Sequence, residues 1–229
     1  MEAVAQNSHQ MPRRTQVMNI SERWSDYERP QYFGVRFGMT ASQLIFSGPS
    51  VDNSTRIGIN GGIVAGFRLS KNVPIFFETG LMYQGKGAYI NGGDADEIDI
   101  RAHFLELPLI FKWKIHTRVD YLKVQPLFGG FLAVGVAGET RFYQADPTVY
   151  GTDALGRYKR GTFSDGSLRA FDAGLRVGCG ISYRNFYAEL TYSISLTNAA
   201  QDEFQDFGYD SFDNTIRHGC LAFTLGLDF

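Results

Sequence analysis

The chain has 229 residues, a formal net charge of −2 at pH 7, and 26 glycines, 19 phenylalanines and 12 tyrosines. Its nearly balanced charge gives no support for binding to nucleic acid. No uncharged run reaches the roughly 18 residues that a membrane-spanning helix needs, which excludes a helical membrane protein. A transmembrane β-barrel is not excluded, because residues that face its lumen interrupt the lipid-facing residues at every second position.

Residues 1–30 form a polar leader without the alternation of a strand. Within it, Ile20, Trp24 and Tyr27 recur at helical spacing, so the leader is either disordered or contains a short amphipathic helix at a membrane interface. The Ala-Val-Ala sequence at 3–5 would suit a signal peptidase, although no basic start or apolar core precedes it. A removed signal peptide and a chance resemblance both explain this short sequence.

Residues 31–229 alternate apolar and small or polar side chains with a period of two, which predicts β-strands. The predicted strands are 32–40, 57–69, 75–86, 104–115, 122–136, 171–184, 186–196 and 221–229. Long connections at 47–55, 91–97, 139–167 and 198–214 alternate with short turns at 70–74, 116–119 and 184–185. An even number of strands and alternating loop lengths are typical of an outer-membrane barrel with its termini in the periplasm. The sequence therefore predicts an all-β fold, a transmembrane antiparallel up-and-down β-barrel of about eight strands.

The two faces of these strands have the wrong polarity for a soluble barrel. One face is regularly apolar, whereas the other carries glycine beside charged residues. A narrow soluble barrel would place its apolar face inside and its charges outside. In the membrane interpretation the charged face lines the lumen, where buried charges must be paired. The predicted lumen network consists of Arg36, Arg68, Glu78, Glu106, Lys112, Asp172, Arg176 and Glu189.

The last strand, 221–229, repeats the pattern most clearly and ends on Phe229. Such an ending is typical of an outer-membrane barrel, in which the last strand closes against the first. Aromatic residues also gather on the apolar face near the short turns, as in an interfacial girdle. The predicted girdle consists of Phe33, Phe67, Phe77, Trp113, Tyr183, Phe186 and Phe229.

The two cysteines, Cys179 and Cys220, fall on opposite faces of the predicted wall and on strands that another strand separates. A disulfide between them is therefore not expected, and both are predicted to be free thiols.

The strand from Phe104 to Lys112, with the sequence FLELPLIFK, resembles the L-E-(I/L)-P-L-L-x-K strand of the PorT-like family of outer membrane β-barrel proteins from Bacteroidetes. The stretches 75–83 and 126–131 are also similar to that family. The resemblance spans roughly 32–229 and implies an outer-membrane barrel of about eight strands. Some members of the family are linked to protein secretion, but a role does not transfer on strand patterns alone.

These patterns favour a structural or interaction role, as a monomeric anchor that presents loops or as an accessory subunit of an envelope or secretion machine. The expected partners are outer-membrane lipid and other envelope proteins. A narrow porin for small solutes is the first alternative, and a soluble lipocalin-like barrel that binds a small apolar ligand is the second. No cofactor, metal site or enzymatic activity is expected, because the four histidines lie outside any recognisable catalytic motif.

Overall fold

The computed structural model describes residues 30–46, 53–91, 97–143, 157–163, 168–199 and 216–229. The amphipathic segment around Ile20, Trp24 and Tyr27 lies outside the described residues. None of the described residues forms a helix that is long and apolar enough to cross a bilayer.

The described residues form ten β-strands. They are β1 (Gln31–Phe46), β2 (Asn53–Arg68), β3 (Ile75–Asn91), β4 (Glu97–Trp113), β5 (Ile115–His116), β6 (Leu122–Tyr143), β7 (Arg157–Gly161), β8 (Phe171–Tyr183), β9 (Phe186–Ser195) and β10 (Ile216–Asp228). Eight of them build the wall, in the order β4-β3-β2-β1-β10-β9-β8-β6, and all pair in antiparallel fashion with their neighbours.

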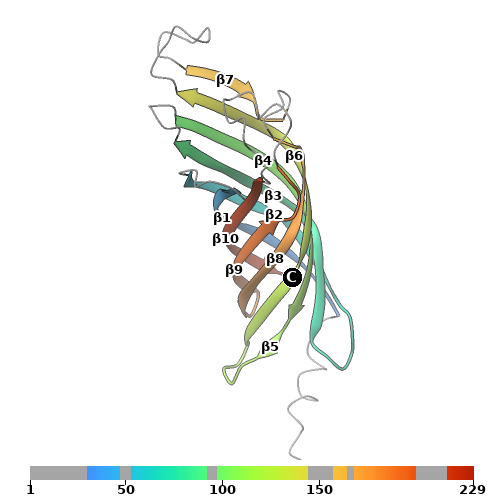
Figure 1. Cartoon of the computed structure of the whole chain (residues 1–229). Helices are drawn as coiled ribbons and strands as arrows, with labels where there is room; N and C mark the ends of the chain where they lie inside the picture. The colour runs from blue at the N-terminus through green and yellow to red at the C-terminus, as the bar shows by residue number, and fades with distance from the viewer. Residues whose placement is uncertain (1–29, 47–52, 92–96, 144–156, 164–167, 200–215) are drawn as a thin grey trace, which may run out of the picture.

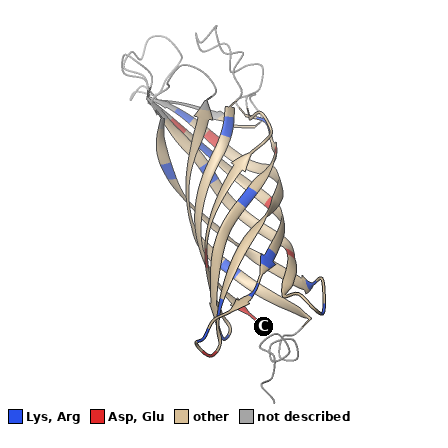
Figure 2. Ribbon diagram, turned by 60° about the horizontal axis from the view of Figure 1, so that its bottom comes forward, with Lys and Arg blue, Asp and Glu red and all other residues tan. Residues whose placement is uncertain are grey.

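The wall is a closed cylinder (Figures 1 and 2) because β4 also pairs with β6 from Glu97↔Tyr143 to Lys112↔Leu127. The first and last strands meet along thirteen residue pairs, from Gly34↔Asp228 to Phe46↔Ile216. The predicted eight-stranded barrel is thus confirmed. Of the two remaining strands, β5 continues the line of β4 against β6, and β7 forms a short outer hairpin with β6.

The strands are longer at the loop end than the alternation predicts. The sequence predicts a long irregular connection at 139–167, but Glu139–Tyr143 continues β6 and pairs with β7. Pairing of β6 with β8 stops at Val134↔Phe171, so the last nine residues of β6 extend beyond β8 together with β3, β4 and β7 (Figure 1). Polar residues occupy both faces of this extension, and alternation is therefore lost there although the backbone pairing continues.

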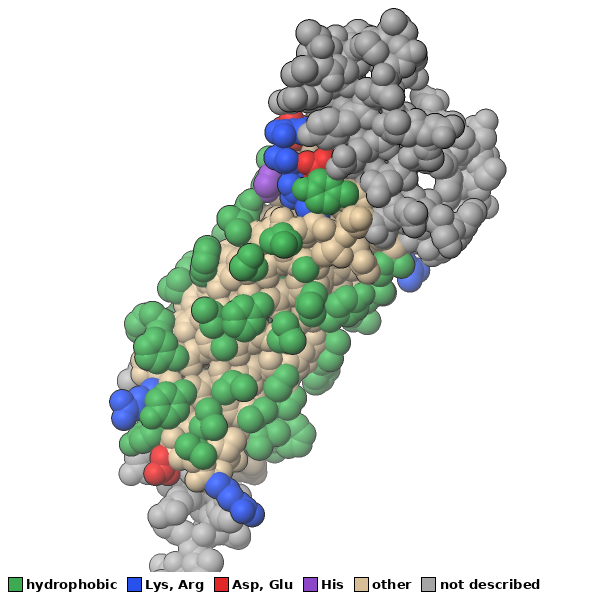
Figure 3. Space-filling model, turned by 90° about the vertical axis from the view of Figure 1, so that its left-hand side faces the viewer, with side chains coloured by type: hydrophobic (Ala, Val, Ile, Leu, Met, Phe, Trp, Pro, Cys, Tyr) green, Lys and Arg blue, Asp and Glu red, His purple; other side chains and the backbone are tan. Residues whose placement is uncertain are grey.

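The apolar face of the wall points outward. Phe37, Phe128 and Phe186 are 65%, 65% and 66% exposed, and the exposed large side chains of all eight wall strands come from the face predicted to be apolar. In Figure 3 apolar side chains cover the middle of the cylinder, while charged side chains gather toward its two ends. This distribution matches a lipid-facing belt and rules out the lipocalin-like alternative, which needs the apolar face inside.

The cysteines follow the same alternation. Cys179 is exposed on the outer face of β8, Cys220 is buried on the inner face of β10, and both thiols are free. The strand β9 lies between them, with Leu190 opposite both Cys179 and Phe223. The prediction of two free thiols is therefore confirmed.

Candidate functional site

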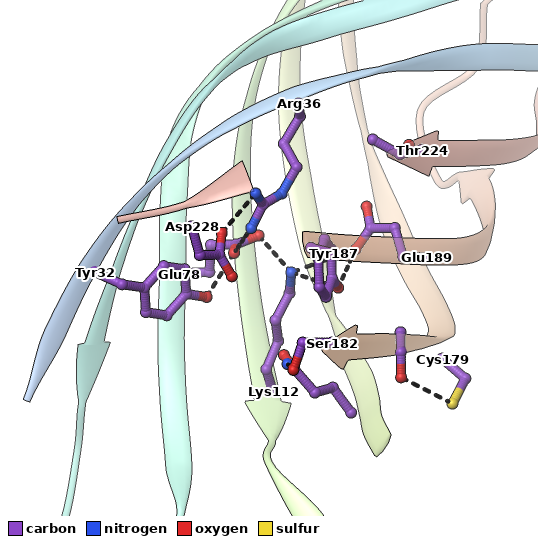
Figure 4. Close-up of polar contacts among 12 residues, drawn as sticks. Tyr32, Arg36, Glu78, Lys112, Cys179, Ser182, Tyr187, Glu189, Thr224 and Asp228 are labelled. Carbon is purple, nitrogen blue, oxygen red and sulfur yellow. Dashed lines mark hydrogen bonds and ion pairs between the residues drawn. The ribbon is translucent and has the colours of Figure 1, made fainter. Parts of the chain in front are cut away.

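The lumen near the short turns is centred on Lys112, whose side chain is 1% exposed. Its Nζ lies 2.8 Å from Oε1 of Glu78 and 3.3 Å from Oε2 of Glu189, and it donates a hydrogen bond of 2.8 Å to Oη of Tyr187 (Figure 4). Tyr187 in turn donates to Oε2 of Glu189 at 2.6 Å. One ammonium group therefore joins β3 and β9 through the interior of the barrel.

Arg36 on β1 extends this cluster toward the seam of the barrel. Its Nη2 lies 3.3 Å from Oε2 of Glu78, and its Nη1 lies 2.7 Å from Oδ1 of Asp228. Its guanidinium also stacks over the ring of Tyr187, 4.3 Å from the centroid. Tyr32 donates to the same Glu78 oxygen at 2.6 Å. Glu78 thus receives Lys112, Arg36 and Tyr32, which is the kind of full pairing that a buried carboxylate requires.

Glycines opposite the tyrosines explain why large rings fit in so narrow a lumen. Gly66 pairs with Tyr32 across the β1–β2 ladder, and the Tyr32 ring occupies the space where a Gly66 side chain would begin. A Cβ at Gly180 would lie 2.5 Å from Oη of Tyr187. The glycines of the inner face therefore leave the space that the two tyrosine rings occupy.

A second layer of the lumen contains Arg176 and Glu106. Nη2 of Arg176 on β8 lies 2.7 Å from Oε1 of Glu106 on β4, which is fully buried. Nε of Arg176 donates to Oγ of Ser193 at 2.7 Å, and Gln84 donates to Glu106 Oε1 at 3.3 Å. As in the cluster around Lys112, the charged side chains of this layer pair with one another inside the barrel.

The third layer, nearer the loop end, is the ion pair of Lys86 and Asp172, with Nζ 3.0 Å from Oδ2. The ammonium lies between the rings of Phe104 and Phe131, 5.0 Å and 4.5 Å from their centroids, an arrangement that favours a cation. Thr197, beyond the end of β9, donates to Oδ1 of Asp172 at 2.9 Å and fixes that segment to the lumen.

A cluster of buried apolar residues, called the apolar plug below, lies toward the loop end beyond this layer. Its members are Leu44, Ala88, Ile100, Leu168, Ala199 and Ile216, with Phe163 packed against them. Leu168 and Ala199 come from segments outside the strands and are held by backbone hydrogen bonds, from Leu168 N to Thr162 O at 2.9 Å and from Ala199 N to Ile216 O at 2.8 Å. Ile100 and Leu168 are fully buried, so the cluster is packed without contact to solvent at these two side chains.

A small cavity lies between the first two layers, lined by Arg36, Glu78, Lys112, Arg176 and Glu189 together with apolar side chains. The volume of this cavity is about 20 Å³. That is room for about one water molecule, so this cavity is too small for a solute or a drug-sized ligand.

The model of the family described as "Outer membrane protein beta-barrel domain" matches residues 5–201. The chain belongs to this outer membrane protein beta-barrel family. Membership places it in the bacterial outer membrane, with the exposed apolar belt against lipid.

Three solved structures are similar to this outer membrane barrel. Ail, the attachment invasion locus protein of Yersinia pestis, is 13% identical, with 88% of this chain and 100% of that chain covered at a TM-score of 0.42. Neisserial surface protein A is 14% identical, with 86% and 97% covered at a TM-score of 0.44. OprG from Pseudomonas aeruginosa is 8% identical, with 88% and 97% covered at a TM-score of 0.38. Among proteins with curated functions, none matches this chain.

The barrel brings seven of the eight residues of the predicted lumen network into its interior layers. Arg36, Glu78, Lys112 and Glu189 share the first layer, Glu106 and Arg176 the second, and Asp172 the third. Arg68 lies elsewhere: as the last residue of β2, it donates from Nε to Ser70 O at 2.9 Å and from Nη2 to Lys71 O at 3.0 Å. The turn that follows β2 places its own carbonyl groups within reach of this guanidinium.

Sequence reasoning did not single out Tyr32, Tyr187 or the apolar plug. Both tyrosines fall on the inner face by parity, so their position could have been found, but the alternation does not show which charged residues they meet. The plug could not have been found in this way, because Leu168 and Ala199 lie outside the alternating strands.

The residues of the predicted girdle lie on the outer face at the turn end. Phe33 and Phe229 exchange two backbone hydrogen bonds at the seam, Phe67 is opposite Phe77, and Tyr183 is opposite Phe186. Trp113, at the end of β4, is 51% exposed.

The described residues contain no group of three or more His, Cys, Asp or Glu side chains that could hold a metal ion.

Proposed function

We propose that this chain is a sealed, non-catalytic and monomeric outer-membrane anchor, which presents its loop end to the cell exterior and its termini to the periplasm. The observation that carries the proposal is the filling of the lumen by three layers of ion pairs, with an apolar plug toward the loop end. A conduit would need continuous polar space, whereas the cavity between the first two layers holds about one water molecule.

The positions of the turns support this orientation. The short connections 69–74, 117–121 and 184–185 lie at the same end as Pro30 and Phe229, because Arg68 N donates to Pro30 O and Asp228 N donates to Asn185 O. Short turns face the periplasm in outer-membrane barrels, and longer loops face outward. In this orientation, the extension formed by β3, β4, β6 and β7 projects from the cell.

The extension supports the role of an anchor. A membrane-spanning strand needs about 9–11 residues, whereas β4 has 17 residues and β6 has 22. The additional residues form a platform above the membrane that could hold a partner at a fixed position. The likeness of the strand from Phe104 to Lys112 to PorT-like proteins of Bacteroidetes supports a partner within the envelope or secretion machinery.

Single-channel recording in planar bilayers tests whether the lumen is sealed. The wild-type barrel should give no steady conductance, and neither should the Glu106→Gln variant, because a neutral side chain of the same size fills the same space. A steady ohmic current through the folded wild-type protein would contradict the proposal and restore the narrow porin.

Thiol labelling in intact cells tests the orientation. In a background with Cys179→Ala and Cys220→Ala, we expect a membrane-impermeant maleimide to label Glu139→Cys at the loop end but not Arg118→Cys at a short turn. The reverse labelling pattern would contradict the proposed orientation, and its outcome is independent of the conductance measurement.

A further inference from the structure

Three arginines gather on the outer face of the barrel where the apolar belt ends. Arg101 lies on β4, four residues beyond the belt residue Leu105 and on the same face. Arg141 lies on the neighbouring strand β6, opposite Asp99, and Arg56 reaches the same group from β2. We call Arg56, Arg101 and Arg141 the arginine cluster.

The cluster is built around Asp99. Nε of Arg56 and Nη2 of Arg101 lie 2.9 Å and 2.8 Å from the two carboxylate oxygens of Asp99, which is 2% exposed. Arg141 pairs with Glu139 at 2.9 Å. Among the described side chains, the group therefore has three guanidinium groups and two carboxylates, and the carboxylates fix the positions of the arginines.

Gly87 makes this convergence possible. Arg56 must cross β3 to reach Asp99 on β4, and it does so over Gly87, where a Cβ would lie 2.7 Å from Cδ of Arg56. Its guanidinium then lies 5.8 Å from the centroid of the Tyr89 ring. A side chain at position 87 would block the crossing, so the sequence of β3 is matched to an arginine on another strand.

The depth of the cluster identifies its ligand. Each residue of a strand advances by about 3.3 Å, so Arg101 lies roughly 13 Å along β4 beyond Leu105, at the level of the lipid head groups. Between them, His103 accepts or donates a hydrogen bond of 2.6 Å to Tyr83, an arrangement suited to an interface. In Figure 3 charged and histidine side chains border the upper end of the apolar surface. A guanidinium at this level faces the phosphate groups of lipids, which it binds through paired N–H groups.

We propose that the arginine cluster binds the phosphate groups of an anionic lipid in the outer leaflet. The structure supports this through geometry: about a third of the Arg101 side chain remains exposed, at 32%, while one edge is fixed by Asp99. An arginine held in this way has exposed N–H donors and loses little rotamer entropy when the lipid binds. The inference takes the orientation proposed above, with the loop end outward.

The test uses the full-length protein in nanodiscs of phosphatidylcholine that contain a minor fraction of a bisphosphorylated glycolipid. Native mass spectrometry counts the glycolipid molecules that remain bound after extraction. The double variant Arg101→Gln and Arg141→Gln should reduce this retention by roughly tenfold, whereas Lys71→Gln with Arg118→Gln, which removes the same charge at the opposite rim, should leave it unchanged. The corresponding Arg→Lys double variant should retain an intermediate amount.

Two further arms use the wild-type protein alone, so they remain decisive if a variant does not fold. Retention of the glycolipid should fall when its phosphates are removed enzymatically, and inorganic phosphate should not displace it. Equal retention of the phosphorylated and the dephosphorylated glycolipid would overturn the proposal. Displacement by inorganic phosphate would overturn the assignment to lipid and leave a site for free phosphate. Neither outcome depends on whether the barrel conducts, so the sealed-anchor proposal is tested separately.

Discussion

Lys112 and Glu189 meet in the lumen with Nζ 3.3 Å from Oε2, although 77 positions separate them in the sequence. They lie on β4 and β9, which are not neighbours in the wall. The contact therefore crosses the interior of the barrel, and with Glu78 it makes one buried ammonium the partner of two carboxylates.

Replacement of Lys112 should expose the dependence of the fold on this ion-pair network. Lys112→Met keeps the length of the side chain but leaves Glu78 and Glu189 without their shared cation. Loss of one partner of a buried pair costs about 3–5 kcal/mol. Urea unfolding in lipid vesicles should show this loss, while Lys71→Met in the exposed turn should change the free energy of unfolding by less than about 0.5 kcal/mol. Equal stability of the two variants would contradict a structural role for the network.

The outer belt should respond to charge according to depth. Leu107 lies midway along β4 and is exposed to lipid. Ile115 lies on β5, which continues β4 at the turn end of the barrel. Leu107→Arg should destabilise the barrel by about 2–4 kcal/mol, and Ile115→Arg by no more than about 1 kcal/mol. The measurement is again the free energy of unfolding from lipid vesicles. If both arginines cost the same, the belt does not span a bilayer as described.

The glycine beneath Tyr32 should not accept a methyl group. A side chain at Gly66 would overlap the ring of Tyr32. That ring packs against Gly66 while its hydroxyl donates a hydrogen bond to Glu78. Gly66→Ala should therefore cost about 1–3 kcal/mol through overpacking. Gly61 on the same strand is the matched control, because its Cβ would meet nothing closer than 3.3 Å. The measurement is the temperature at which the band of the folded barrel is lost on a gel. If Gly66→Ala lowers this temperature no more than Gly61→Ala does, the Tyr32 ring can move away.

The wall of the barrel was predictable because its two faces meet different solvents. A strand such as β10 alternates Leu221, Phe223 and Leu225 with small or polar residues. This single pattern predicts both the strand and which of its side chains point outward. Inward charges such as Glu106 could be predicted for the same reason. Their partners could not, because closure and register decide which of the inner residues on other strands each one meets.

Other features could not be predicted for identifiable physical reasons. The extension of β6 beyond Gly138 has polar residues on both faces, so no periodicity marks it. Leu168 enters the plug from a segment without regular structure, and its burial depends on the mouth that other strands form. Arg68 has the correct parity for the lumen, but it lies at the rim, where carbonyl groups of the turn are nearer than any carboxylate of the network.

A spin-label scan along β10 tests the central claim most directly. Single cysteines at positions 221 to 225, in a background without Cys179 and Cys220, carry a nitroxide whose collisions with oxygen and with a water-soluble nickel complex are measured in vesicles. The account predicts high oxygen accessibility at 221, 223 and 225, and low accessibility to both reagents at 222 and 224, which are buried on the inner face. Nickel accessibility at 222 and 224 would indicate a water-filled pore, and low oxygen accessibility at 221, 223 and 225 would contradict the membrane barrel itself.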